Sequence, residues 1–294
     1  DGDDNPNRPR LTSDGPNEPA PTAPVVPASI PRLDVDAGAA DADVDAADAD
    51  LDADVDDEDT DVDTGQPEPP EGMALVGSDP GFFIDELEVS VSDYAGCVSA
   101  SRCEPATHVS LTPEAFEVLG VLDADRAAFE SAWQGRCNAR AGNGDMPVNC
   151  VTFRNAQAYC TSKGKRLPTG TEWLAAAGDG RYIWGDAAPT CADSCYGANT
   201  ECSSERGDIQ TCVRGSHKRD ITGAGVADLA GNVAEWVVDS GPKLDPTGPP
   251  SRIVRGGSFY DGAKSLPSKT ARAFPPTTSF VGIGFRCALD VTSD

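Results

Sequence analysis

The feature that most limits how this chain of 294 residues can fold is its set of ten cysteines, all of which lie between positions 97 and 287. Their number is even, and no two of them form the C-x-x-C pair that is typical of a zinc site. The two histidines, His108 and His217, also lie outside any zinc-ligand spacing. The pattern therefore favours five disulfides over bound zinc, and disulfides indicate an oxidising, extracytoplasmic compartment.

Some cysteines are close neighbours in the sequence and others are far apart. Two pairs are closely spaced, four further cysteines form a cluster, and two stand alone. In chain order they are Cys97 and Cys103, Cys137 and Cys150, the single Cys160, the cluster Cys191, Cys195, Cys202 and Cys212, and the single Cys287. Spacing leaves the pairing within the cluster open.

Charge divides the chain into two parts. Residues 1–72 hold 22 Asp and Glu against three Arg, a net charge of −19, whereas residues 73–294 carry −7. The first part has no aromatic residue and no cysteine, so it cannot bury enough apolar surface to offset the entropy of ordering it. We expect residues 1–72 to form a disordered acidic spacer rich in Asp, Ala and Pro. Residues 73–294 are long enough to form one folded domain.

Composition also excludes several classes of partner. The Asp-rich run alternates D-x-D as calcium loops do, but it lacks their glycine and their closing Glu, so we interpret it as a solvated tether. No basic patch is present, which argues against nucleic acid. No apolar run is long enough to span a membrane. We interpret the abrupt start at Asp1 as an exported chain whose signal was removed.

Helical signals come early in the folded part. The stretch GFFIDELEVSVSDYAGCV opens with an apolar run that predicts a strand, and Ser90 or Ser92 can cap the helix that follows. The mixed helical spacing at 111–133 predicts one or two surface helices. Thr152 can cap a further helix that ends before residue 164. The apolar face of that helix consists of Phe153, Ala156, Tyr159 and Cys160.

Strand signals dominate the end of the chain. Thr169 and Glu172 have the spacing of a capping box for one more helix. After residue 185 the chain is rich in loops for about 40 residues. The last 45 residues then predict three short strands. The fold class is therefore α+β, with much irregular structure.

Seven stretches follow one another along nearly all of residues 73–294: FFIDELEVSVSDY, PVNCVTFRNAQAYC, GKRLPTGTEW, YIWG, VADLAGNVAEW, RIVRGGSF and GFRCA. Taken in this order, they resemble the formylglycine-generating (sulfatase-modifying factor) enzyme family. The resemblance implies that family's variant of the C-type lectin fold, with little regular secondary structure. It also implies a disulfide between Cys160 and Cys287, which by loop closure would stabilise the fold by about 4–5 kcal/mol.

The same resemblance raises the question of catalysis. Active members of the family carry two neighbouring cysteines between RGGS and GFRC, where they bind copper for oxygen chemistry. Monovalent copper is soft and requires thiolate ligands. In this chain residues 259–283 contain no cysteine, and Ala234 replaces the active-site tryptophan of the family motif GN-x-W-E-W. We therefore expect no copper and no catalytic residue. Ser258 and Arg272 remain as a vestigial cleft, for which strand-end hydrogen bonding is the favoured role.

The stretch DLAGNVAEW at 228–236 places two carboxylates seven residues apart, with a Gly-Asn bend between them. From the residues alone, the alternatives are a turn before an ordinary strand and a hard-cation site built from oxygen ligands. The resemblance implies a calcium ion held by the side chains of Asp228 and Glu235 and by the carbonyls of Gly231 and Val233. It also implies a second calcium site, with the weaker candidates Asn199, Thr200 and Asp208.

These observations predict an exported, non-catalytic binding or display module, stabilised by calcium and carried on an acidic tether. The insert at 104–145 and the cysteine-bridged loops at 186–215 would be the displayed parts. Its ligand would be an extended peptide, a protein or a glycan, and the spacer would tether it to a surface as in a bacterial lipoprotein. Two alternatives stay open: an active oxidoreductase of the sulfatase-maturation type, which acts on protein cysteine, and a structural cell-surface component.

Overall fold

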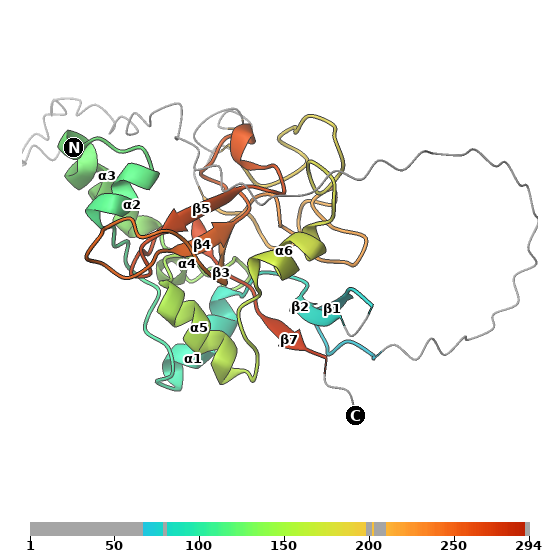
Figure 1. Cartoon of the computed structure of the whole chain (residues 1–294). Helices are drawn as coiled ribbons and strands as arrows, with labels where there is room; N and C mark the ends of the chain where they lie inside the picture. The colour runs from blue at the N-terminus through green and yellow to red at the C-terminus, as the bar shows by residue number, and fades with distance from the viewer. Residues whose placement is uncertain (1–66, 79–80, 198–201, 203–209, 292–294) are drawn as a thin grey trace, which may run out of the picture.

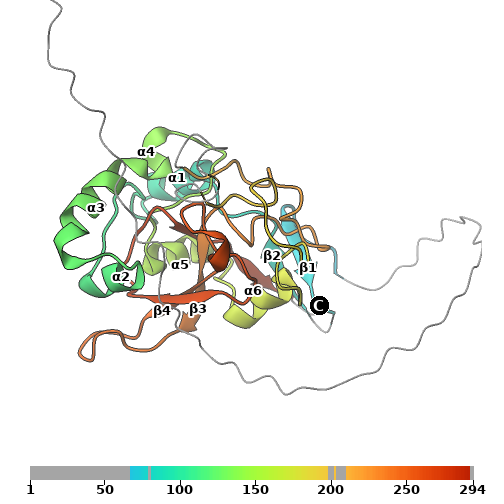
Figure 2. The same cartoon turned by 90° about the horizontal axis from the view of Figure 1, so that it is seen from above.

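The computed structural model describes residues 67–78, 81–197, 202 and 210–291. Most of the predicted spacer, residues 1–66, lies outside the described residues. Short helices surround two small sheets, and long loops connect them (Figures 1 and 2). In both views, α2 and α3 lie at one end of the domain and β1 and β2 at the other.

The first sheet joins the start of the domain to its end. It has the order β1-β2-β7, with β1 at Met73–Val76, β2 at Phe82–Asp85 and β7 at Ala288–Asp290. Both pairings are antiparallel, and Ile84 on the central strand lies opposite both Ala74 and Ala288. The strand predicted from the apolar run that opens GFFIDELEVSVSDYAGCV is therefore present as β2. Because β7 pairs with β2, the two ends of the domain are held together.

The second sheet has the order β5-β4-β3-β6 and is built from the last third of the chain. Its strands are β3 at Ala234–Ser240, β4 at Arg252–Arg255, β5 at Ala271–Phe274 and β6 at Ile283–Gly284. The β3–β6 pair is parallel and the other pairs are antiparallel. The expectation of three strands in the final 45 residues was too low, because the last apolar run divides into β6 and β7, which enter different sheets.

Side-chain caps set the starts of four helices, α2 with Thr112 among them. Ser90, rather than Ser92, caps α1 (Val91–Ser99), because its hydroxyl accepts from the Asp93 N–H at 2.9 Å. Thr152 caps α5 (Phe153–Ser162), and the four apolar residues expected on one face are buried. Thr169 and Glu172 form the predicted capping box of α6 (Gly170–Ala177).

The segment 111–141 forms the helical end of the domain. Its elements are α2 at Pro113–Val118, η1 at Asp123–Asp125, α3 at Arg126–Trp133, η2 at Gln134–Arg136 and α4 at Asn138–Ala141; a further short turn, η3, lies at Ala263–Ser265. Of the one or two predicted surface helices, two exist, α2 and α3, but each buries aromatic side chains. Trp133 packs edge-on against Tyr260 with ring centroids 5.1 Å apart, and Phe129 stacks on Phe280 at 5.8 Å. These contacts fix the insert to the core.

All ten cysteines are paired, so the prediction of five disulfides holds. The bridges are Cys97–Cys103, Cys137–Cys150, Cys160–Cys287, Cys191–Cys202 and Cys195–Cys212. The structure thus settles the pairing within the cluster of four and contains the long-range bridge that the resemblance implied. The described residues between 178 and 233 contain no helix and no strand, so the two bridges of the cluster cross-link an irregular region. None of the described helices is long and apolar enough to cross a membrane.

Candidate functional site

The loop that leads into β3 lies in the interior of the domain. Asp228 and Asn232 have positive φ angles of 60° and 59°, a conformation that Asn and Asp tolerate better than most residues. Gly231 is required because a Cβ there would lie 2.3 Å from the Ser194 hydroxyl oxygen and 2.5 Å from the Cys195 carbonyl oxygen. The Asn232 N–H donates to that same carbonyl at 2.8 Å. The Gly-Asn bend therefore packs closely against the disulfide-rich segment at Ser194 and Cys195.

Glu235, on β3, forms a fully buried ion pair with Arg286. The Arg286 Nη2 and Nε donate to the Glu235 Oε1 and Oε2 at 2.7 and 2.8 Å. The Trp173 Nε1, from α6, donates to the Glu235 Oε2 at 2.8 Å. Although burial lowers the pKa of Arg286, the neighbouring Glu235 carboxylate raises it overall. Glu235 is thus the point where β3, α6 and the segment between β6 and β7 meet.

The rest of the Arg286 guanidinium binds backbone. Its Nη1 donates to the carbonyls of Asp85 and Glu86 at 2.9 and 3.0 Å, and its Nη2 donates to the Ala227 carbonyl at 2.7 Å. Arg286 therefore ties the end of β2 to the start of the 228–235 loop. Because this side chain is fully buried and all its nitrogens are hydrogen-bonded, it fixes the two sheets relative to each other around the site.

A second carboxylic acid, Glu88, lies in the same place and was missed in the sequence. Its Oε2 accepts from the Asn232 side-chain amide at 2.8 Å and its Oε1 from the Val233 N–H at 3.2 Å. Burial, followed by repulsion from Asp228 and Glu235, raises the pKa of Glu88 well above its usual value. The only signal in the sequence is that this acid stands between the apolar residues Leu87 and Val89.

Two aspartates complete the acidic cluster. The Asp228 Oδ2 accepts from the Gly215 N–H, and burial raises the pKa of Asp228 to about 6. Asp220, also missed in the sequence, accepts from the Ala230 N–H at 3.0 Å and from the Ser194 hydroxyl at 2.8 Å. Burial, followed by repulsion from Asp228, raises the pKa of Asp220 to about 7.

The cluster suits a hard cation in the type of its donors and in its charge. Its four carboxyl groups, from Glu88, Asp220, Asp228 and Glu235, are at most 1% exposed, and Arg286 is a charge partner of each of them. Oxygen donors with surplus negative charge are what calcium requires. In this structure, however, both Glu235 oxygens accept hydrogen bonds from Arg286.

The predicted ligand side chains Asp228 and Glu235 do not belong to a ready-made metal-binding group of side chains. Within the described part of the chain, no group of three or more His, Cys, Asp or Glu side chains has the arrangement of a metal site. A site of the predicted kind would take half its protein ligands from carbonyls, those of Gly231 and Val233. The candidates for the second calcium site, Asn199, Thr200 and Asp208, lie outside the described residues.

Ser258 and Arg272, the residues of the predicted vestigial cleft, are joined through a third residue, Asp261. The Arg272 guanidinium donates to both Asp261 carboxylate oxygens at 2.9 and 2.8 Å. The Ser258 hydroxyl donates to the Asp261 Oδ2 at 2.7 Å. All three side chains are largely buried and are joined by these hydrogen bonds, although the buried Arg272 Nε has no hydrogen-bond partner within the described part of the chain.

This network does not fit a copper ion. Its donors are a hydroxyl, a carboxylate and a guanidinium, whereas monovalent copper requires soft sulfur ligands. None of the ten cysteines has a free thiol, and residues 259–283 supply no cysteine. The two histidines do not join the network either: His108 contacts Thr107 and His217 contacts Ser216.

Comparison with known proteins gives a matching family model and similar individual proteins. The model of a family described as "Sulfatase-modifying factor enzyme 1-like domain" matches residues 48–291, so the match begins inside the predicted spacer. The formylglycine-generating enzyme of Streptomyces coelicolor is 30% identical over 71% of this chain and 78% of its own length. The inactive C-alpha-formylglycine-generating enzyme 2 of Mus musculus is 30% identical over 49% of each chain.

Solved structures agree with this fold. The crystal structure of CarF superposes with a TM-score of 0.50 at 18% identity, covering 74% of this chain and 93% of that chain. The domain has the C-type lectin-like fold, in which two small sheets and short helices carry long, disulfide-linked loops.

Proposed function

The chain belongs to the sulfatase-modifying factor enzyme 1-like family, and we propose that it is a member that binds a ligand without oxidising cysteine. The observation that carries this proposal is that all ten cysteines are in disulfides. A member that generates formylglycine would need free thiols for copper between Ser258 and Gly284. The buried network of Ser258, Asp261 and Arg272 lies in that interval instead.

The comparisons support this proposal, because the similar proteins include one that is named as inactive as well as one that is named as active. A test incubates the purified domain with copper, oxygen and a C-x-P-x-R peptide, and follows the mass of the cysteine. We expect no formylglycine, while the Streptomyces coelicolor enzyme converts the same peptide in parallel. Formylglycine formation by this chain would show that the alternative function, an active oxidoreductase, is correct.

The binding role rests on loops carried by a cross-linked scaffold. Trp133 and Phe129 anchor the helical insert at 104–145 to the core. The disulfides of Cys191 and Cys195 cross-link the loop region at 186–215. Both segments can therefore vary at the surface without disturbing the core. Five disulfides require an oxidising compartment, which supports export. The acidic residues 1–72 would tether the domain to a surface.

A glycan array and a peptide array test the binding role. A binding module retains a specific ligand at micromolar concentration. A structural cell-surface component retains none and instead assembles or stays anchored, which would overturn the proposal. A disulfide-intact sample heated until it unfolds is the control for non-specific retention.

We also propose that calcium stabilises the domain through Asp228, Glu235 and the carbonyls of Gly231 and Val233. The proposal is supported by the surplus of buried carboxyl groups over guanidinium groups around Arg286. A cation that binds only the folded state raises its stability, by about 2.7 kcal/mol at a hundred times its Kd. EDTA should therefore lower the melting temperature, and calcium should restore it.

The variant Glu235→Ala provides the control for chelation. It removes one calcium ligand, so its melting temperature should be lower than that of the wild-type protein and should no longer respond to EDTA. An unchanged melting temperature of the wild-type protein in EDTA would show that Glu235 acts only as the partner of Arg286.

A further inference from the structure

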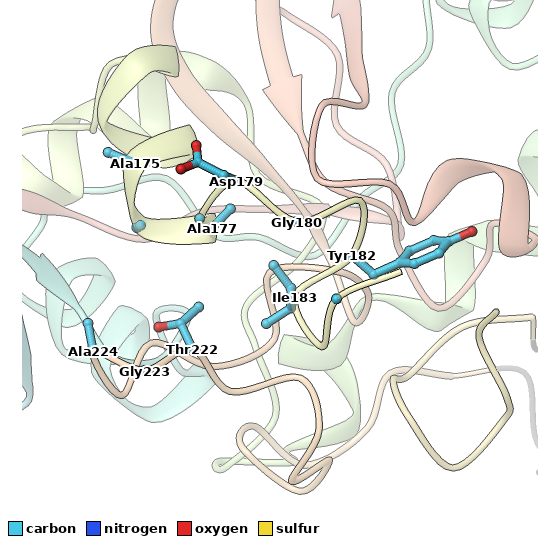
Figure 3. A pocket seen from close by; sticks show the side chains of 12 residues that line it. Ala175, Ala177, Asp179, Gly180, Tyr182, Ile183, Thr222, Gly223 and Ala224 are labelled. Carbon is cyan, nitrogen blue, oxygen red and sulfur yellow. The ribbon is translucent and has the colours of Figure 1, made fainter. Parts of the chain in front are cut away.

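A pocket at the C-terminal end of α6 shares no residue with the acidic cluster or with the Ser258 network (Figure 3). Its volume is about 410 Å³, and its walls come from residues 175–185 and 222–224. Eight of its twelve lining residues are Gly or Ala, so backbone polar groups, which larger side chains would cover, are exposed on its walls. In Figure 3, Ile183 lies between the end of α6 and the turn at Thr222.

Hydrogen bonds hold the walls of this pocket in shape. Tyr182 and Gly185 exchange two backbone hydrogen bonds of 3.0 Å, which close a tight turn. A Cβ at Gly180 would lie 2.8 Å from the Tyr182 carbonyl oxygen, so this turn depends on glycine. On the other wall, the Thr222 N–H donates to the Val226 carbonyl at 2.9 Å. The pocket is therefore preformed.

The end of α6 makes one wall electronegative. The Gly178 N–H closes the helix by donating to the Leu174 carbonyl at 3.0 Å. The next three carbonyls, at positions 175–177, accept no hydrogen bond from the described part of the chain. They carry the negative end of the helix dipole. Asp179, the one charged side chain in the lining, is exposed directly after them.

We propose that this pocket receives a lysine side chain from a protein partner. An ammonium group has three donors and no acceptor, so it complements the unbonded carbonyls at the end of α6 and the Asp179 carboxylate. The aliphatic stem of the lysine would lie on Ile183 and the alanines beside it. This proposal rests on the binding role proposed above and names its site and its chemistry.

The test titrates the whole chain with a blocked glycine peptide that has one central lysine, and with the same peptide carrying norleucine. Backbone NMR signals report the site. We expect the lysine peptide to shift the amides of residues 178–180 and 222–224, and the norleucine peptide to leave them in place. Equal shifts with both peptides would overturn the proposal, because the rim would then contribute nothing.

Two variants with matched controls test the geometry. Gly223→Leu fills the pocket, and it should fold because a Cβ there meets nothing within 4 Å and its φ is not positive. It should weaken lysine binding about tenfold or more. Gly135→Leu, at an equally open position outside the pocket, should not. Asp179→Asn should weaken binding about threefold, as expected for an exposed charge, whereas Asp186→Asn, outside the lining, should have no effect.

The outcomes separate this proposal from the broader one. If an array ligand is retained and Gly223→Leu does not weaken it, the pocket assignment is wrong and the binding role stands. If the lysine peptide and every array ligand fail to bind, both proposals are wrong. If Gly223→Leu does not fold, the comparison of the two peptides and the Asp179→Asn variant decide the question.

Discussion

Replacing Arg286 by methionine should destabilise the domain more than any other single change at the buried cluster. The substitution keeps an unbranched apolar stem but removes the guanidinium that pairs with Glu235 at 2.7 to 3.0 Å. It also removes the donors to three backbone carbonyls at the junction of the two sheets. The unfolded chain loses nothing comparable, because its charges are hydrated.

The size of the loss in unfolding free energy follows from the charges that stay buried after the substitution. A buried ion pair that loses one partner typically costs about 3–5 kcal/mol, since the other charge remains uncompensated. Here Glu235 would remain beside Glu88 and Asp228, two further buried acids, so we expect at least about 4 kcal/mol. For a domain of this size that corresponds to a fall in the melting temperature of roughly 8–16 °C.

Urea unfolding under non-oxidising, non-reducing conditions, with the disulfides intact, measures the loss. The double variant Arg286→Met with Glu235→Gln should recover a large part of it, because the direct partner of Arg286 then carries no charge. Arg252→Met is the control. The Arg252 side chain lies over the ring of Phe153 and donates to one carbonyl, but it is partly exposed, so its loss should cost about 1 kcal/mol or less. A loss below about 1 kcal/mol for Arg286→Met would refute the reasoning, and so would a double variant no more stable than the single one.

Three further predictions concern the scaffold. Replacing Cys160 and Cys287 by alanine opens a bridge with a sequence separation of 127, so unfolding experiments should show a loss of about 4–5 kcal/mol. Thr169→Ala should lower the unfolding free energy by about 1 kcal/mol, because the N-cap of α6 loses its acceptor; an unchanged value would mean that the cap is replaced by water. Burial raises the pKa of Glu172, but hydrogen bonds from Arg166 and Thr169 lower it overall. The stabilisation from Glu172 is therefore present above its unfolded pKa and lost as the pH falls through its folded pKa. Unfolding curves of Glu172→Gln and the wild-type protein should accordingly converge in acid, and a constant difference between pH 7 and pH 3 would contradict this.

Local signals in the sequence were sufficient for several elements. The caps at Thr152 and Thr169 and the buried face of α5 involve residues within one or two turns of each other, and the structure has all of them. The even cysteine count and the family motifs likewise predicted the disulfides and the lectin-like fold. Where two local choices were equivalent, as for Ser90 and Ser92, only the packed structure could decide between them.

The sequence by itself therefore determined the type of fold, the disulfide content and the lack of a cysteine between Ser258 and Gly284. Tertiary structure decided which buried groups meet. Trp173 reaches Glu235 across 62 residues, and Glu88 reaches the Val233 N–H across 145. Such contacts leave no periodic pattern in the sequence, because a carboxylate in an apolar run looks the same whether it faces water or a guanidinium. The partner of such a carboxylate is specified only when the two sheets pack together and exclude water, because a charge buried there is costly unless it is paired.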